Sequence, residues 1–226
     1  MSGTTINENK RTRKLSYITP DGGYGYVVAA ALMIFTCVTF VPNTCFGLIY
    51  GSYLAQIGDE TRSVTTVTSF FNTAFHFSGI FTNLLLQKCS ERTVALIGAL
   101  MIFGANLGTI FVTTVEHLVM TYAVIQGLGI GIFLAAILTV FNLYFDEKKK
   151  VVMGVGQSFT VMITIFYPMF VKNLLDAYGF RGTVAILAAI SSHVILAAVS
   201  LHPVKMHMKK VVMTDMEIEF DLRQEC

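Results

Sequence analysis

The hydrophobic residues of this chain fall into six long stretches, which short polar segments separate. The stretches cover residues 24–54, 64–87, 93–113, 117–145, 151–175 and 182–202. A membrane core about 30 Å thick needs roughly 20 consecutive apolar residues in a helix, and each stretch reaches that length. The pattern therefore predicts an all-α polytopic membrane protein, a six-transmembrane-helix bundle.

The same pattern divides the chain into three parts. Residues 1–19, with a basic run at 10–14, are expected to be a disordered cytoplasmic tail, and residues 20–205 the six-helix transmembrane domain. Residues 206–226 turn acidic from Asp215 onward and read as a cytoplasmic tail or the start of a central loop. The first apolar stretch far exceeds the ~7–15 residues of a signal-peptide core, so no cleavable signal peptide is expected.

The composition argues against a soluble enzyme. Hydrophobic residues make up 54% of the chain and charged residues 13%, whereas soluble domains carry roughly 25% charged residues. The four cysteines form neither a Cys-x-x-Cys pair nor a zinc-binding spacing, so we expect no metal site. No nucleophile–base pair or phosphate-binding loop is visible in the sequence. We therefore expect no catalytic residue, no cofactor and no nucleic-acid partner, and we expect the lipid bilayer to surround the chain.

The distribution of Lys and Arg predicts the orientation. With six spans, thirteen of these residues fall on the side of the two termini and three on the opposite side. Loops rich in Lys and Arg stay in the cytoplasm. Both termini are thus predicted to be cytoplasmic, in a multi-pass protein expected in the plasma membrane.

The second stretch carries polar residues at helical spacing, which places them on one stripe. They are Thr65, Ser69, Asn72, His76 and Asn83. Because unsatisfied polar groups in lipid cost several kcal/mol each, the stripe must face protein or water. It either lines a substrate cavity or supplies hydrogen bonds that hold the bundle together. His76, near the middle of the span, is either a functional ionisable group or a neutral side chain satisfied by a neighbouring helix.

Two further features concern helix packing. Asn43 follows Pro42 in the first stretch, where a proline can kink the helix, and Asn43 joins the cavity-lining candidates. Glycines recur at small-xxx-small spacing, in Gly47–Gly51 and Gly104–Gly108, and at alternate positions from 127 to 131. Such residues let helix backbones approach closely in a membrane, so a tightly packed bundle is predicted.

Three segments resemble signatures of the monocarboxylate transporter family of the major facilitator superfamily. The first precedes the first span, the second leads into the fifth, and the third precedes the sixth. They contain Asp21, Gly22, Gly23, Tyr24, Gly25 and Tyr26; Tyr144 and Phe145; and Arg181 and Gly182. Tyr24 and Tyr26 stand where tryptophan is commoner in the family. We expect all of these residues to maintain the fold rather than to touch substrate.

The resemblance covers about residues 20–205 and matches only the amino-terminal six-helix half of a major facilitator fold. It implies transport of small monocarboxylates or related organic solutes, by proton-coupled symport and alternating access. Asn43 lies near the position where many family members have a lysine, and His76 where some have a tyrosine. A neutral solute is therefore an alternative to an organic anion as the transported substrate. The partners considered are a carboxy-terminal half, a second copy of the chain, or a single-span ancillary protein.

An alternative function also follows from the half-length match. A truncated relative that does not transport would instead bind or regulate a full-length transporter. No Asp, Glu or Arg lies within any of the six apolar stretches. The charged pair that proton coupling needs in this family would then have to come from another half.

Overall fold

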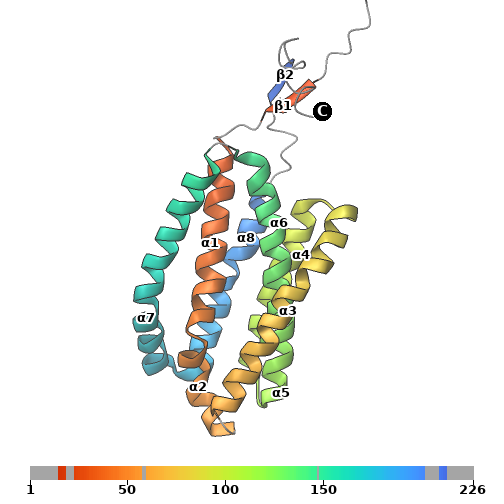
Figure 1. The fold of residues 1–226 in the computed structure, drawn as a ribbon. Coiled ribbons are helices and arrows are strands. Elements are labelled where there is room, and N and C mark those ends of the chain that lie inside the picture. The colour runs from red at the N-terminus through yellow and green to blue at the C-terminus, as the bar shows by residue number, and fades with distance from the viewer. Residues whose placement is uncertain (1–14, 19–22, 58–59, 147, 202–208, 213–226) are drawn as a thin grey trace, which may run out of the picture.

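A computed structural model describes residues 15–18, 23–57, 60–146, 148–201 and 209–212 of the chain (Figure 1). The helices, in chain order, are α1 (Gly25–Thr44), α2 (Phe46–Ile57), α3 (Glu60–Lys88), α4 (Glu91–Ile110), α5 (Val115–Leu118), η1 (Val119–Gln126), α6 (Gly127–Tyr144), α7 (Lys149–Ser191) and α8 (His193–Ser200). Two short strands, β1 (Leu15–Ile18) and β2 (Lys209–Val212), flank them.

The first apolar stretch does not form one uninterrupted helix, and the fifth and sixth stretches are joined in α7 with a break between them. The first is divided between α1 and α2 at Cys45, three residues after Pro42. Proline has no backbone N–H and its ring crowds the preceding turn, which interrupts a helix. In α7 the break is at Gly179, whose φ of 66° and ψ of −175° suit glycine almost alone. The helix therefore turns back there, and its last part continues into α8.

Four helical segments of the described chain are long and apolar enough to cross a membrane. They are Gly25–Thr44, Glu91–Ile110, Val115–Tyr144 and Lys149–Ser200, the last containing the break at Gly179. At 29 residues α3 is long enough, but its polar side chains keep it out of this group. The structure thus shows a helical protein with segments long and apolar enough to span a membrane, and the count of six spans stays a prediction.

The helices run side by side, and their connections alternate between two ends of the bundle. Figure 1 shows the β1–β2 ladder, the α3–α4 turn and the start of α7 at one end, and α2 and α5 at the other. β1 and β2 pair antiparallel with Leu15 opposite Val212. The ladder joins short parts of the two segments that the sequence analysis assigned to the tails.

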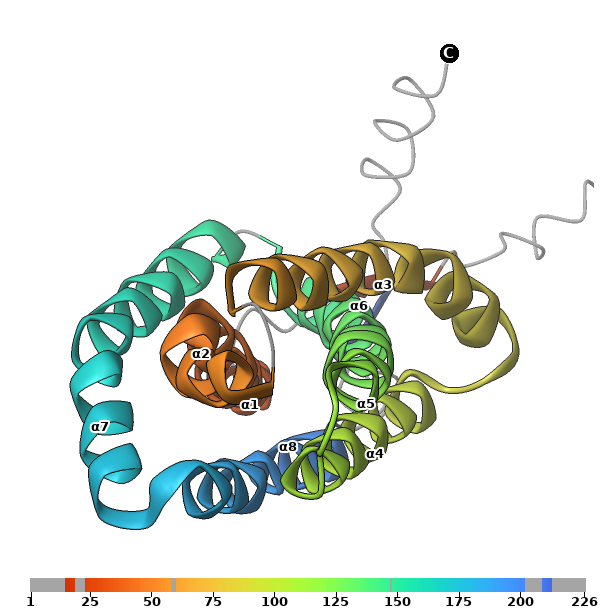
Figure 2. The same ribbon diagram turned by 90° about the horizontal axis from the view of Figure 1, so that it is seen from below.

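The centre of the bundle is α6, which packs against both α3 and α4. Figure 2 shows α1 and α2 between α7 and α6, with α3 and α4 beside α6. On the α1 side of α6, Phe35 stacks on Phe133 with ring centroids 4.4 Å apart. Both side chains are fully buried, as is most of the inner face of α6.

Glycines let α6 approach its neighbours, at the alternate positions that the sequence analysis singled out. A methyl group at Gly129 would lie 3.1 Å from the Gly98 carbonyl oxygen of α4, and one at Gly131 would lie 2.8 Å from the Phe75 carbonyl oxygen of α3. The small-xxx-small pairs are less informative. A methyl group at Gly47 or Gly104 would meet nothing within 4 Å, so these two glycines are not close-packing sites within the described chain.

Replacing Gly131 by alanine is expected to lower the free energy of unfolding by about 1–3 kcal/mol, because the added methyl group overlaps Ser78 and the α3 backbone. The matched control is Gly104→Ala, which adds the same methyl group to α4 at a position with no neighbouring atom within 4 Å. That change should be neutral or stabilising by about 0.5–1 kcal/mol. Thermal unfolding of the purified variants in detergent measures both. Equal midpoints for the two variants would contradict the packing described here.

Candidate functional site

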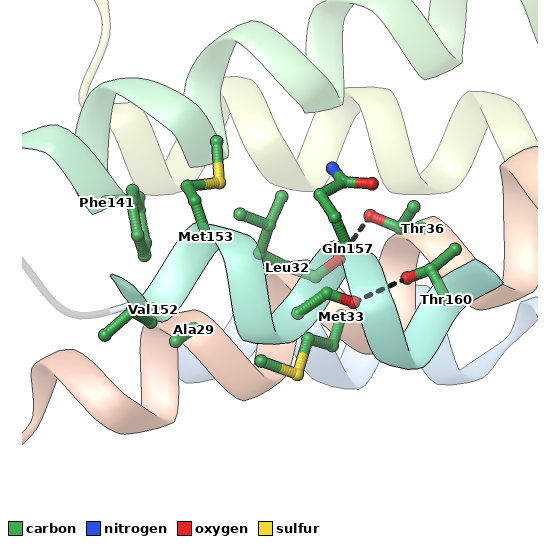
Figure 3. A pocket seen from close by; sticks show the side chains of 10 residues that line it. Ala29, Leu32, Met33, Thr36, Phe141, Val152, Met153, Gln157 and Thr160 are labelled. Atoms are coloured by element: carbon green, nitrogen blue, oxygen red, sulfur yellow. Dashed lines mark hydrogen bonds between the residues drawn. The ribbon is translucent and has the colours of Figure 1, made fainter. Parts of the chain in front are cut away.

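A pocket of about 360 Å³ lies between α1, α6 and α7, and we call it the solute pocket. α6 contributes Leu134 and Leu138, and the other two helices contribute Leu32, Thr36, Phe40, Val41, Thr44, Met153, Gln157, Thr160 and Thr164. A smaller neighbouring hollow shares five of these residues and extends along α1 and α7 toward Ala29 and Val152 (Figure 3). Within the described part of the chain, no charged side chain lines either hollow.

The threonine hydroxyls of the solute pocket donate their hydrogen bonds to their own helices. Thr36 Oγ1 donates to the Leu32 carbonyl at 2.8 Å, and Thr160 Oγ1 donates to the Gly156 carbonyl at 3.0 Å (Figure 3). Thr164 Oγ1 donates to the Thr160 carbonyl at 2.9 Å. A hydroxyl has one proton and two lone pairs. These hydroxyls therefore satisfy their donors within the helix and keep lone pairs to accept a hydrogen bond from a solute.

Gln157 differs from these threonines. Its side chain is exposed, and the structure shows no hydrogen bond to its amide from any described residue. In Figure 3 the Gln157 side chain projects from α7 and lies beside Leu32 and Thr36 of α1 in this view. An amide offers both donors and an acceptor. Gln157 is thus the side chain of the solute pocket best placed to pair with a carboxylate, hydroxyl or carbonyl group.

The predicted cavity-lining residues occupy two other places. Asn43 is partly buried, and its Oδ1 accepts a hydrogen bond from Tyr122 Oη at 3.0 Å. On α3, the side chains of Ser69, Asn72, His76 and Asn83 are at least partly exposed. None of the five lines the solute pocket, although Thr44, the residue after Asn43, does.

One residue next to the polar stripe of α3, Phe75, contacts the lining of the solute pocket. The His76 ring lies 5.2 Å from the Phe75 ring, and Phe75 packs edge-on against Phe40 at 5.8 Å. Phe40 in turn lines the pocket. The residues of α3 that face the core are different ones, among them Ser78 and Thr82, which are buried.

Sequence reasoning missed the polar residues of α7. Met153, Gln157, Thr160 and Thr164 recur at intervals of four, three and four, which places them on one face of a helix. This is the same signal that identified the stripe on α3. It is weaker here because the face mixes methionine with threonine, and threonine is common in helices that only pack.

The signature segments lie at the ends of the bundle and not at the solute pocket. The Tyr24 hydroxyl donates to the Ser200 carbonyl, and the Tyr26 ring packs edge-on against Phe145 at 5.7 Å. A methyl group at Gly25 would lie 3.0 Å from the Phe145 ring. Residues of the first two signature segments therefore contact each other. Asp21 and Gly22 lie outside the described residues, whereas Gly23 is described and has a φ of 61°.

At the other end, the third signature shapes the turn before the last part of α7. Phe180 stacks on Tyr53 with ring centroids 4.1 Å apart and an angle of 6° between the ring planes. A methyl group at Gly182 would lie 2.7 Å from Tyr178 Cβ. Arg181 is exposed beside them. These contacts favour the structural role that the sequence analysis expects.

A buried polar group lies near Asn43. Tyr122 is buried together with Gln126, one turn further along η1. The Gln126 Oε1 and Tyr167 Oη atoms are buried and have no hydrogen-bond partner among the described residues. Short stretches of π-helix such as η1 are frequent at functional sites. In contrast, no group of three His, Cys, Asp or Glu side chains in the described chain is arranged to hold a metal ion.

Comparison with known families matches residues 32–212 to the model of the Major Facilitator Superfamily. Among curated relatives, Monocarboxylate transporter 9 of Gallus gallus is 22% identical over 186 residues, which is 82% of this chain and 37% of that protein. Monocarboxylate transporter 2 of Rattus norvegicus is 24% identical over 187 residues, 83% of this chain and 38% of that protein. Monocarboxylate transporter 13 of the same species is 21% identical over 187 residues, 83% of this chain and 44% of that protein. The chain thus spans about two fifths of the length of these relatives.

The unpartnered amide oxygen of Gln126 predicts an unusual response to mutation. Because a buried polar atom without a partner costs about 1–3 kcal/mol, Gln126→Met is expected to raise the free energy of unfolding by about 1 kcal/mol. Tyr122→Phe removes the hydrogen bond to Asn43 and should lower it by a similar amount. Thermal unfolding in detergent measures both changes. A lower midpoint for Gln126→Met would mean that Oε1 has a partner, such as a buried water molecule.

Proposed function

Because this chain belongs to the Major Facilitator Superfamily, we propose that it serves the transport of small monocarboxylates or related organic solutes across a membrane. It acts as the amino-terminal half of a carrier that works by alternating access, in which two halves rock around a central site. The observation that carries this proposal is the solute pocket, a hollow with several polar groups between apolar membrane helices. The names of the curated relatives support the substrate class.

The chemistry of the solute pocket defines what this half contributes. Its described lining offers hydroxyl lone pairs and the Gln157 amide, and no charge. This half therefore orients a solute by hydrogen bonds and shape. A carboxylate would also need a positive charge from outside this lining. A protonated His76 on the polar stripe of α3 is one source within this chain, and a second half is another.

Proton coupling is part of the same proposal. His76 carries an exposed imidazole on α3, and its neighbour Phe75 contacts Phe40 of the solute pocket. An imidazole can take up and release a proton. Symport would follow if the protonated form of His76 attracts the solute carboxylate. The stripe from Ser69 to Asn83 would then line the path between the two halves.

In the proposed carrier, a partner protein segment must bury the exposed apolar side chains of this half. Apolar side chains next to the polar stripe and next to the solute pocket are exposed, including Phe77 and Ile80 of α3 and Val161 and Ile165 of α7. A carboxy-terminal half or a second copy of the chain would cover them. The same exposed side chains support the second candidate function, in which a non-transporting chain binds and regulates a full-length transporter.

We further propose six membrane spans in the plasma membrane, with both termini in the cytoplasm. The excess of Lys and Arg on one side supports this orientation. The alternation of connections between the two ends of the bundle supports the repeated crossing, whichever end faces the cytoplasm (Figure 1). The α3–α4 turn and the β1–β2 ladder would then lie on the cytoplasmic side.

Filling the solute pocket tests the transport proposal. Thr36→Trp is expected to weaken solute binding at least tenfold, because the indole occupies the space between α1 and α7. The matched control is Ile34→Trp, which places the same side chain on an exposed face of α1 that lines neither hollow. Binding is measured as solute-dependent thermal stabilisation of the reconstituted protein across a panel of short monocarboxylates and neutral hydroxylated solutes. Uptake into the same vesicles is measured in parallel.

The two candidate functions give different results in this experiment. Binding by the wild-type protein and by Ile34→Trp, with loss in Thr36→Trp, supports a transport site even if uptake requires a second half. Absence of binding to every solute, together with capture of a full-length transporter, would favour the regulatory function. Equal binding by both tryptophan variants would show that the solute pocket is not the site.

Labelling of cysteines tests the topology. Cys89 is exposed between α3 and α4 and should react with a membrane-impermeant maleimide only after the cells are permeabilised. A control cysteine at Thr113, exposed in the α4–α5 connection at the opposite end, should react in intact cells. Both are measured with Cys37, Cys45 and Cys226 replaced by serine. Labelling of Cys89 in intact cells would refute the cytoplasmic placement of the termini.

A further inference from the structure

A second hollow lies along α1 and α7, and we call it the α1–α7 groove. It has a volume of about 550 Å³ and is open along one side of the bundle. Ala30, Met33, Val151 and Val155 form its apolar wall, and Tyr26 and Lys148 lie at the end where α1 and α7 begin. None of the residues that line this groove comes from α6.

The groove lies on the other side of the α1–α7 contact from the solute pocket. With about 100° between successive residues of a helix, Val155 of the groove and Gln157 of the pocket point about 160° apart on α7. On α1 the two sets of residues share a face, because Ala29 of the groove and Thr36 of the pocket are seven residues apart and point about 20° from each other. A partner that covers the Gln157 face of α7 would therefore still leave the Val155 face open.

The wall of the groove is suited to an acyl chain. It consists of aliphatic side chains with one methionine, and Val151 and Val155 are 68% and 62% exposed. Helices in a bilayer are surrounded by acyl chains, and a hollow of this kind between two helices is filled by lipid or by another helix. Within the described residues, no other helix enters the groove.

Lys148 gives the groove a charged end. It is exposed, precedes the first residue of α7, and is the one charged side chain that lines the groove in the described chain. Lys149 and Lys150 follow it, so three lysines outweigh the two acidic residues at 146 and 147. Lysines at the cytoplasmic surface of a membrane attract anionic headgroups, and Tyr26 is of the aromatic type that is enriched at that level.

We propose that the α1–α7 groove binds an anionic phospholipid of the adjacent leaflet. One acyl chain lies against Ala30, Met33 and Val155, and the anionic headgroup pairs with Lys148. This inference goes beyond transport. It requires only that α1 and α7 cross a membrane, and the assignment of the leaflet to the cytoplasmic side rests on the proposed orientation.

The absence of tryptophan from the chain gives a clean test. Tyr26→Trp places the only tryptophan of the chain at the groove, at a position 52% exposed and packed on Phe145, and excitation at the red edge of the tryptophan band avoids the tyrosines. The full chain is reconstituted in vesicles that contain brominated lipids, whose bromines quench a tryptophan in contact with them. Brominated phosphatidylserine is compared with brominated phosphatidylcholine. Leu196→Trp is the control, because it exposes a tryptophan on α8, outside the groove.

In the Tyr26→Trp protein we expect phosphatidylserine to bind beside the indole about fivefold more tightly than phosphatidylcholine, the contribution of about one lysine at a membrane surface. The preference should disappear when Lys148→Gln is added, persist with Lys148→Arg and weaken with added salt. In the Leu196→Trp protein the two lipids should quench equally. Equal quenching by both lipids in the Tyr26→Trp protein would overturn the proposal. So would the absence of quenching by either lipid, because protein would then cover the groove.

Discussion

The close approach of α6 to α3 and α4 is the constraint on which the rest of the structure depends. Lipid tails are as apolar as leucine, so burial of apolar surface gives membrane helices little reason to associate. Contact between backbones must supply the attraction instead, and it requires positions without side chains. Gly129 against Gly98, and Gly131 against the α3 backbone, provide them. The position of α6 then fixes Leu134 and Leu138, which close one side of the solute pocket.

A second constraint is the satisfaction of polar groups in an apolar environment. The threonines of the solute pocket bond to carbonyls of their own helices, so they stay stable whether or not a solute is present. Gln157 and the buried Gln126 do not follow this rule. A buried polar group without a partner lowers stability. The buried Gln126 therefore carries such a cost, whereas Gln157 is exposed and its amide has no partner among the described residues.

Much of the fold follows from the sequence. Apolar stretches longer than 20 residues predicted the positions of the helices, since a bilayer accepts little else. The spacing of Ser69, Asn72, His76 and Asn83 predicted a single stripe, and the structure adds that these side chains are exposed. The kink after Pro42 and the break at Gly179, which falls between the fifth and sixth stretches, agree with the sequence, but the residues at which the helices end, such as Thr44, were not predicted. Proline and glycine are tolerated within membrane helices, so the residues alone do not say where a helix ends. The solute pocket was missed because it combines residues from three helices, and which faces of those helices meet depends on glycine contacts between distant residues.

The contact between α1 and α7 lies between the solute pocket and the α1–α7 groove, and the smaller hollow along it shares residues with both. Gly156 allows Met33 to approach, since a methyl group there would lie 3.0 Å from Met33 Cε, and Cys37 Sγ lies 4.0 Å from Thr160 Oγ1. Met33 lines the groove, and Thr160 lines the pocket. A rotation of α7 that moves Thr160 away from α1 must therefore also move Val155 relative to Met33. Because the two hollows share one pair of helices, a change in the shape of either one changes the other.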